Sequence, residues 1–351
     1  MLFSGFVAFS VGVNSIIRKA RKREGSVKEV CRGVVDDCWN GKYFVAGTHF
    51  NQFWSRDFGW CVKALVKEGY RDRVIRTLRN VLQIFEKEGK VKVLVAGGKG
   101  IDYPSFAVDS LPWIVRALRE SGLREFRTFI EKEASRLAKL IDRETHLLRK
   151  GYFASIRDCA VRNSSTYDNT MLAMLSSDLD ALGFKNPLSK FHIKDAMMKY
   201  LWTGTHFKND LDDESVSADA VVFPFTTGVF KDKGMIKSSI EKAVKEGLSS
   251  PAPLKFSTRD IKKPITGYSL LKNYQGTSIW THTGPLFISL LRKVRPALVS
   301  RHIRTYKKII RRFGTYPEVL NSNLNLFRTP FYRSDEGMLW AVNFPGLIRN
   351  L

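Results

Sequence analysis

Cysteine, proline and glutamine are scarce in this chain. Its 351 residues include four cysteines (Cys31, Cys38, Cys61 and Cys159), twelve prolines and three glutamines. Four cysteines are too few for a disulfide scaffold in a chain of this length, and none of them forms a CxxC pair. We therefore expect a reducing, cytoplasmic location. Low glutamine beside abundant lysine and arginine is a bias of heat-adapted proteins and hints at a thermophile.

Acidic residues are also few, which leaves the chain strongly basic. Lys and Arg number 58 against 34 Asp and Glu, a formal net charge of +24. A positive charge of this size favours binding to a nucleic acid, a membrane surface or an acidic polymer. No recognition motif accompanies the basic residues, whose densest run is Arg301, Arg304, Lys307, Lys308, Arg311 and Arg312. A solvated helix face explains this run better, with a polyanion-binding protein as the alternative.

Signature motifs of several enzyme classes are missing. The chain contains no GxGxxG, GxxxxGK[ST], HExxH or GxSxG sequence. Nucleotide binding, zinc proteolysis and serine hydrolysis therefore lack their usual residues, and we expect neither a cofactor nor a metal. The sequence indicates no oligomeric state.

Long apolar runs are missing too, apart from one stretch at the N-terminus. Residues 1–17 carry no charge and precede the basic run 18–23. This order of apolar and positive residues is wrong for a secretory signal but suits an anchor facing the cytoplasm. A membrane span needs about 20 apolar residues. We therefore favour a buried first element, within an N-terminal extension of residues 1–24, over a membrane anchor.

Helical periodicity dominates the chain, which is 44% hydrophobic and 12% aromatic. Apolar residues recur at three- and four-residue intervals, as in Val74, Leu78, Val81 and Phe85. Few stretches alternate as a half-buried strand would. The pattern predicts helices near residues 9–39, 57–69, 71–88, 105–121, 123–143, 166–182, 187–203, 215–230, 233–248, 276–292, 297–313 and 335–346.

The links between these helices alternate in length. Tight links such as residues 68–70 and 121–123 contain glycine and join antiparallel neighbours. Long links lie at about 40–56, 89–104, 144–165, 204–214, 249–275 and 314–334. If the helices run alternately up and down, all the long links leave the same face. This predicts one all-α domain, residues 1–351, folded as an (α/α)6 toroid of six hairpins, with an open solenoid as the alternative.

The long links hold the most distinctive side chains. Trp54, Arg56 and Asp57 crowd together where the first link ends, and Trp280 and His282 follow the end of the fifth. Tryptophan faces stack on the apolar faces of sugar rings, and Arg and Asp bind hydroxyls by charge-assisted hydrogen bonds. The candidate sugar-binding residues are Trp54, Arg56, Asp57, Asp109, Tyr167, Asp168, Trp280, His282 and Glu336.

Several of these candidates also have a structural explanation. Asp57, Asp109, Asp168 and Glu336 lie near expected helix starts, where acids are favoured for capping and for the helix dipole. A lone histidine such as His282 is more often structural than functional. Both interpretations stay open for each of these residues.

Two further acids are candidates for catalysis. Glu318 follows Pro317 in the sixth link, where it has no obvious capping role. Asp158 lies in the third link and could instead pair with a neighbouring arginine.

Four segments, in the long links or just after them, carry a family resemblance. Residues 53–57 (FWSRD) resemble a WxRD motif, 108–113 (VDSLPW) a VDSxxWW-like motif, 278–282 (SIWTH) an SIWPxW motif and 316–318 (YPE) a WPE motif. These motifs are typical of the six-hairpin glycosidases, the superfamily of glucoamylases, neutral invertases, trehalases and the glucosidase part of glycogen-debranching enzymes. The matches run in the family's order from about residue 51 to 340.

The resemblance implies an inverting glycosidase that acts on an oligosaccharide or small α-glucoside. In such an enzyme a carboxylic acid protonates the glycosidic oxygen while a carboxylate, about 6.5–9.5 Å away, activates water on the opposite face. The resemblance makes Glu318 the base and Asp158 the acid, with Asp168 as a rival. Tyr316 replaces the family's tryptophan, which is expected to alter the sugar surface. A phosphorylase or a sugar-binding pseudoenzyme would fit the same motifs.

Overall fold

The computed structural model describes residues 13–15, 17–150, 155–265, 268–292 and 294–349. Most of the apolar stretch 1–17, the alternative membrane anchor, lies outside these ranges. None of the helices in the described ranges combines the length and apolar character that a membrane span needs.

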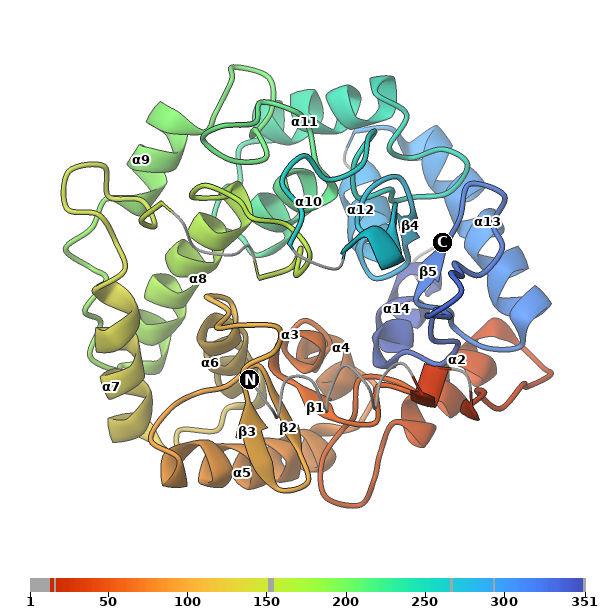
Figure 1. Ribbon diagram of the computed structural model, residues 1–351, viewed down its shortest axis with the longest axis horizontal. Coiled ribbons are helices and arrows are strands. Elements are labelled where there is room, and N and C mark those ends of the chain that lie inside the picture. The colour runs from red at the N-terminus through yellow and green to blue at the C-terminus, as the bar shows by residue number, and fades with distance from the viewer. Residues whose placement is uncertain (1–12, 16, 151–154, 266–267, 293, 350–351) are drawn as a thin grey trace.

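The helices form two concentric rings (Figure 1). Going along the chain, inner-ring elements alternate with single outer helices. The inner ring closes where η2 (Leu339–Asn343) contacts α3 (Ser55–Gly59) and α4 (Val62–Lys67). This closure confirms the predicted α/α toroid over the open solenoid. The outer ring contains α2 (Val27–Asp37), α5 (Arg71–Lys87), α7 (Arg127–Ala138), α9 (Ile193–Tyr200), α11 (Lys233–Lys245) and α13 (Pro296–Phe313). The inner ring contains α3 (Ser55–Gly59), α4 (Val62–Lys67), α6 (Ser110–Ser121), α8 (Thr166–Leu182), α10 (Ala218–Thr226), α12 (Thr283–Leu291), η2 (Leu339–Asn343) and α14 (Pro345–Ile348).

Burial explains which ring each helix joins. Helix α13 buries Val299, Ile303 and Ile310 on one face, whereas its basic residues lie exposed or half-exposed on the other. A helix with a single apolar face belongs on the outside of the molecule. Helices α10 and α12 are buried on nearly every side and lie between the outer helices and the centre. The basic residues between 301 and 312 thus lie on the solvent-facing side of an outer helix.

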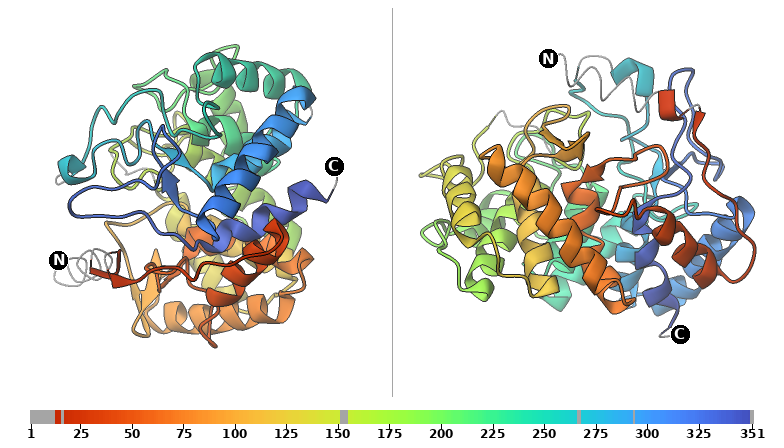
Figure 2. Two further views of the ribbon diagram at one scale, coloured as in Figure 1. Left: turned by 90° about the vertical axis from the view of Figure 1, so that its right-hand side faces the viewer. Right: turned by 90° about the horizontal axis from the view of Figure 1, so that it is seen from below.

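The two kinds of link lie at opposite ends of the toroid. Gly122 and Gly183 end α6 and α8 with positive φ angles of 75° and 70°, a conformation that glycine adopts without strain. The longer links project together from the other end (Figure 2). The loops that carry the candidate residues are therefore gathered on one face.

Two small antiparallel sheets, which the sequence does not predict, form among these loops. One contains β1 (Phe53–Trp54), β2 (Leu94–Ala96) and β3 (Lys99–Ile101), and the other pairs β4 (Ile279–Trp280) with β5 (Val319–Leu320). A strictly all-α fold is therefore not confirmed, although helices form the toroid itself. Pairing satisfies the backbone groups of buried loop segments. It also fixes Trp280 opposite Val319, next to Glu318 in the chain.

The first, tenth and last expected helices differ from the observed elements. The expected helix 9–39 is interrupted, because Gly25 has a φ of 108° and Ser26 caps the start of α2. In the stretch 276–292, β4 precedes α12, which begins only at Thr283. The expected helix 335–346 is a 3-10 segment and one short helix, η2 and α14. The break at Gly25 is local, whereas at β4 and η2 backbone hydrogen bonds to residues distant in sequence override the local helical pattern.

A tight approach between α12 and α13 makes a testable prediction about stability. A Cβ on Gly284 would lie 1.8 Å from the Tyr306 hydroxyl and 2.6 Å from the Pro253 carbonyl oxygen. We expect Gly284→Ala to lower the free energy of unfolding by about 1–3 kcal/mol, because helix or loop must shift. Gly346→Ala in α14, which meets no atom within 4 Å, is the control. Equal urea midpoints for the two variants would contradict the prediction.

Candidate active site

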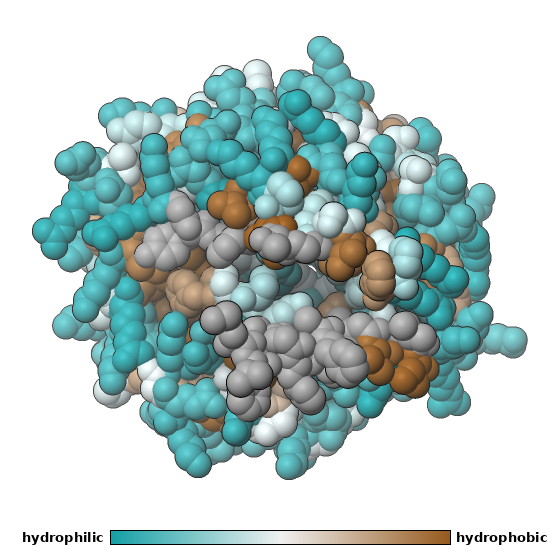
Figure 3. Space-filling view, viewed as in Figure 1, coloured by the Kyte–Doolittle hydropathy of each residue, from teal (hydrophilic) through white to brown (hydrophobic). Residues whose placement is uncertain are grey.

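A cavity of about 360 Å³ opens on the loop face of the toroid. The same face is hollowed near its centre in the space-filling view (Figure 3). Six of the eleven candidates line the cavity: Trp54, Arg56, Asp57, Asp158, Trp280 and Glu318. They come from residues 54–57, 158, 280 and 318, so four separate loops converge here.

Glu318 is buried and held by four donors. The hydroxyl of Tyr332 donates to its carboxylate at 2.6 Å, the Asp335 backbone N–H donates at 2.9 Å, and the hydroxyls of Tyr274 and Ser334 also donate. Burial raises the pKa of Glu318 to about 7 despite these hydrogen bonds, which favour the ionised form. A carboxylate of this kind is positioned and is basic enough to accept a proton near neutral pH.

Arg56 lies at the centre of a group of carboxylates. Its guanidinium contacts Asp158 at 3.1 Å and Asp109 at 3.4 Å, and it also donates to the Ser155 carbonyl. Burial lowers the pKa of Arg56. The nearby carboxylates of Asp158, Asp109 and Asp57 raise it by more, so the net shift is upward. Arg56 is therefore a fixed cation in the wall of the cavity.

Asp158 reaches the cavity from the third long loop and is the more accessible of the two candidate catalytic acids. Its side chain is 29% exposed, against 2% for residue Glu318. Burial is the largest cause of its raised pKa, which the neighbouring Arg56 counteracts. A carboxyl of raised pKa that faces a cavity has the properties of a proton donor.

Asp57 is a third carboxyl at the cavity. It follows Arg56 in α3 and is 8% exposed. Burial raises its pKa to about 7; Arg56 lowers the pKa and Asp158 raises it further. Three carboxyls of raised pKa thus line one cavity, a concentration typical of functional sites.

Apolar surface borders these polar groups. Trp54 and Trp280 line the cavity, and Leu270 and Phe331 at the same cavity remain 50% and 60% exposed. Trp280 is oriented by a hydrogen bond from its Nε1 to the carbonyl of Tyr274 at 2.6 Å. A cavity that combines carboxyls, a guanidinium and exposed apolar faces suits a ligand with hydroxyls on its edges and C–H groups on its faces.

Three candidates lie behind the cavity instead of lining it. Asp109 accepts hydrogen bonds from Arg56 and from the Tyr167 hydroxyl, the latter at 2.9 Å, and Tyr167 in turn accepts one from Trp113. Asp168 is 1% exposed and its carboxylate accepts from the hydroxyls of Ser155 and Ser165 at the start of α8. Asp109, held by the Tyr167 hydroxyl, accepts a hydrogen bond from Arg56 behind the cavity. Asp168 exchanges hydrogen bonds with Ser165, the N-cap of α8, as an acid in the first turn of a helix commonly does.

The remaining candidates are also packed away from the cavity. The His282 ring stacks on Trp60 at a centroid distance of 4.7 Å, and burial holds its pKa well below the usual value. Glu336 pairs with Arg333 and is 7% exposed. Tyr316, expected to alter a sugar surface, is buried and donates to the Thr281 carbonyl at 3.1 Å. Tyr316 itself is not among the residues that line the described cavity.

Two tyrosines of the site were not identified from the sequence. Tyr274 and Tyr332 contact Glu318 and line the cavity, but nothing local distinguishes them from the chain's other tyrosines. They reach Glu318 only because residues 274, 318 and 332 are brought together by the packing of two long loops. Their hydroxyls are also hydrogen-bonded to each other at 3.3 Å.

Comparison with solved structures places this cavity in a known architecture. A rhamnosidase from Klebsiella oxytoca with rhamnose bound superposes with a TM-score of 0.66 at 14% identity, covering 92% of this chain and 63% of that one. The GH78 rhamnosidase of a Bacillus species gives 0.64 at 16% identity, covering 95% and 35%. The GH63 mannosylglycerate hydrolase of Thermus thermophilus, in complex with Tris and D-glycerate, gives 0.57 at 14% identity, covering 93% and 100%. No family model and no curated protein matches the sequence.

The chain has the (α/α)6 fold of the six-hairpin glycosidases. It spans about 63% and 35% of the length of the two rhamnosidases. The matched region covers at least nine-tenths of this chain in each comparison. At these low identities the likeness concerns the fold, and the chemistry depends on the side chains of the cavity.

Proposed function

We propose that this protein is an inverting glycoside hydrolase acting on an oligosaccharide or a small α-glucoside. The observation that carries the proposal is that Asp158 and Glu318, both with raised pKa values, line one cavity with Trp54 and Trp280. Two carboxyls at a sugar-sized cavity are the groups that glycoside hydrolysis requires. The fold shared with rhamnosidases and a mannosylglycerate hydrolase supports it.

In the proposed reaction Glu318 acts as the base. Its carboxylate accepts a proton from water, whose oxygen attacks the anomeric carbon, while Asp158 donates its proton to the departing glycosidic oxygen. The glycosidic bond breaks as the new carbon–oxygen bond forms, so the anomeric configuration inverts. Every proton given by Asp158 is balanced by one taken by Glu318. After each turnover, proton exchange with solvent reprotonates Asp158 and deprotonates Glu318. The partial exposure of the Asp158 side chain allows this exchange.

The other cavity residues bind the sugar. Arg56 and Asp57 offer a donor and an acceptor for adjacent hydroxyls, and the ring faces of Trp54 and Trp280 stack on the pyranose. Arg56 also lies within ion-pair distance of Asp158, which fixes the acid's carboxyl in the cavity. The carbohydrate is the partner that this site requires.

A substrate panel tests the proposal directly. Candidate substrates are α-linked gluco-oligosaccharides, sucrose, trehalose and aryl α-rhamnosides and α-mannosides, each with and without phosphate. We expect hydrolysis of at least one, with the first-formed product of inverted configuration by NMR. Retention of configuration would refute the inverting mechanism. Strict dependence on phosphate would identify a phosphorylase, and sugar binding without turnover would identify a pseudoenzyme.

The hydrogen bond from Tyr332 to Glu318 leads to a prediction about the pH dependence of activity. The Tyr332 hydrogen bond favours the ionised Glu318 and lowers its pKa. Because the base works ionised, activity falls as the pH drops through that pKa, which is about 7. Tyr332→Phe should move the acidic limb of kcat/KM upward by about one pH unit. Tyr306→Phe is the control, since Tyr306 is buried but bonds to the Pro253 carbonyl. An unmoved limb would show that Tyr332 does not tune the base.

A further inference from the structure

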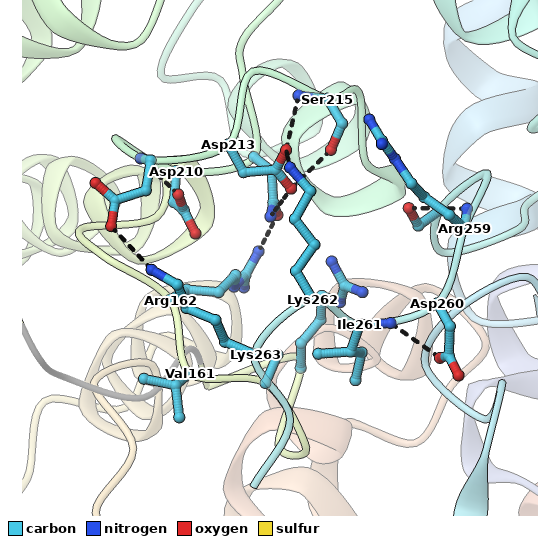
Figure 4. A pocket seen from close by; sticks show the side chains of 15 residues that line it. Val161, Arg162, Asp210, Asp213, Ser215, Arg259, Asp260, Ile261, Lys262 and Lys263 are labelled. Carbon is cyan, nitrogen blue, oxygen red and sulfur yellow. Dashed lines mark hydrogen bonds and ion pairs between the residues drawn. The ribbon is translucent and has the colours of Figure 1, made fainter.

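A second, smaller cavity of about 50 Å³ lies beside the same loop that carries Asp158 (Figure 4). Arg157 and residues 160–162 line it, whereas Asp158 and Cys159 line the large cavity. The segment 157–162 therefore separates the two cavities. Loops 209–215 and 257–263 complete the small one.

Arg157 is a buried cation without a carboxylate partner among the described residues. The residue is 4% exposed, its Nη2 donates to the Gln275 carbonyl at 2.8 Å, and its guanidinium stacks on Phe256 at 5.2 Å. Its Nε, also buried, has no acceptor. Burial, followed by the repulsion from Arg162, lowers the pKa of Arg157 to about 10. The group still carries its charge at neutral pH.

Arg162 is only partly satisfied by its neighbours. It is 3% exposed, and its Nη1 contacts the carboxylate of Asp219 and the amide oxygen of Asn209. Its Nε and Nη2 are buried without an acceptor. Two adjacent guanidinium groups thus leave three buried nitrogens unpaired. Buried N–H groups of this kind are expensive unless a partner is present.

The acids around the cavity are occupied by other donors. Asp213 pairs with Lys262 at 2.8 Å and Asp212 with Lys263 at 3.3 Å. Asp260 accepts from the Tyr268 hydroxyl at 2.5 Å and from two backbone N–H groups. Asp210 accepts from the backbone N–H groups of Asp212 and Asn163. None of these carboxylates is hydrogen-bonded to the unpaired nitrogens of Arg157 and Arg162.

We propose that the small cavity binds an inorganic oxyanion of the size of phosphate, held by Arg157 and Arg162. An oxyanion supplies acceptors for the three unpaired nitrogens and a counter-charge for Arg157. The volume exceeds the space of about 10–15 Å³ that one water molecule needs. Lys262, Lys263 and the exposed Arg259 line the same cavity and attract an anion toward it. Bound there, the anion braces the segment that presents Asp158.

Thermal unfolding of the full chain tests the site. Sodium phosphate is titrated against sodium chloride at equal ionic strength, and we expect a saturable rise of the unfolding temperature with phosphate alone. Arg157→Gln should abolish the rise, while Lys307→Gln on the outer face of α13 should keep it. The double replacement of exposed Lys262 and Lys263 by Gln, which leaves the core untouched, should weaken the apparent affinity at least threefold. This second variant decides the matter if Arg157→Gln fails to fold.

Several outcomes would overturn the proposal. An absent or non-saturable rise would mean that water alone fills the cavity. An unchanged response in both the Arg157 and the double lysine variants would place the anion elsewhere. Loss of the response in Glu318→Gln would place phosphate in the large cavity, as expected for a phosphorylase. An equal rise with sodium acetate would make the ligand a carboxylate instead of a phosphate-sized ion.

Discussion

Replacing Glu318 by Gln is expected to lower kcat/KM by about 10²- to 10⁴-fold on whichever glycoside the panel identifies. The amide keeps the size and the hydrogen-bonding environment of the carboxyl but cannot take a proton from water. Four donors surround the side chain, so it remains in place. The loss should therefore fall on kcat, with KM changed much less, in steady-state assays at neutral pH.

Glu133→Gln is the matched control for this variant. Glu133 is also a buried glutamate, 6% exposed, but it accepts from the Val91 backbone N–H and pairs with Arg136 in the outer helix α7. Replacing Glu133 by Gln tests the effect of losing a buried carboxylate on stability and leaves the cavity that contains Glu318 unchanged. Wild-type turnover by a folded Glu318→Gln protein would remove Glu318 from the mechanism, and an equal loss in Glu133→Gln would point to damaged folding.

Asp158→Asn should produce a loss that depends on the leaving group. With a natural sugar as leaving group, kcat/KM is expected to fall by about 10²- to 10⁴-fold, because no acid protonates the departing oxygen. With a dinitrophenyl leaving group, which departs without protonation, the loss should be much smaller. The pH profile should also lose the part that reports the protonation of Asp158, whose pKa burial raises.

Asp168→Asn distinguishes the rival acid. Asp168 is bonded to Ser155 and Ser165 behind the cavity, so its replacement should cost stability and a far smaller part of kcat. An equal deficit on natural and dinitrophenyl substrates in Asp158→Asn would contradict its role as the acid. A leaving-group-dependent deficit in Asp168→Asn would transfer that role to Asp168.

The sequence indicated part of the cavity lining where the candidate residues are close together in the chain. Trp54, Arg56 and Asp57 lie within four consecutive positions, and all of them line the cavity. Asp109 and Tyr167, predicted as sugar-binding residues, lie behind the cavity, because the orientation of each helix decides whether a side chain faces the cavity or the Arg56 side of it. Local sequence does not contain that orientation.

The sequence by itself determined the succession of one-sided and buried helices, the alternation of short and long links, and hence the six hairpins with their loops at one end. Apolar periodicity and glycine turns are local properties, so they can be read without knowledge of distant contacts. Only the tertiary structure decided that Tyr274 and Tyr332 clamp Glu318, that Arg56 holds Asp158, and that Arg157 and Arg162 are buried without sufficient acceptors. These features arise where loops from remote parts of the chain pack together, and burial there sets the pKa values on which the chemistry depends.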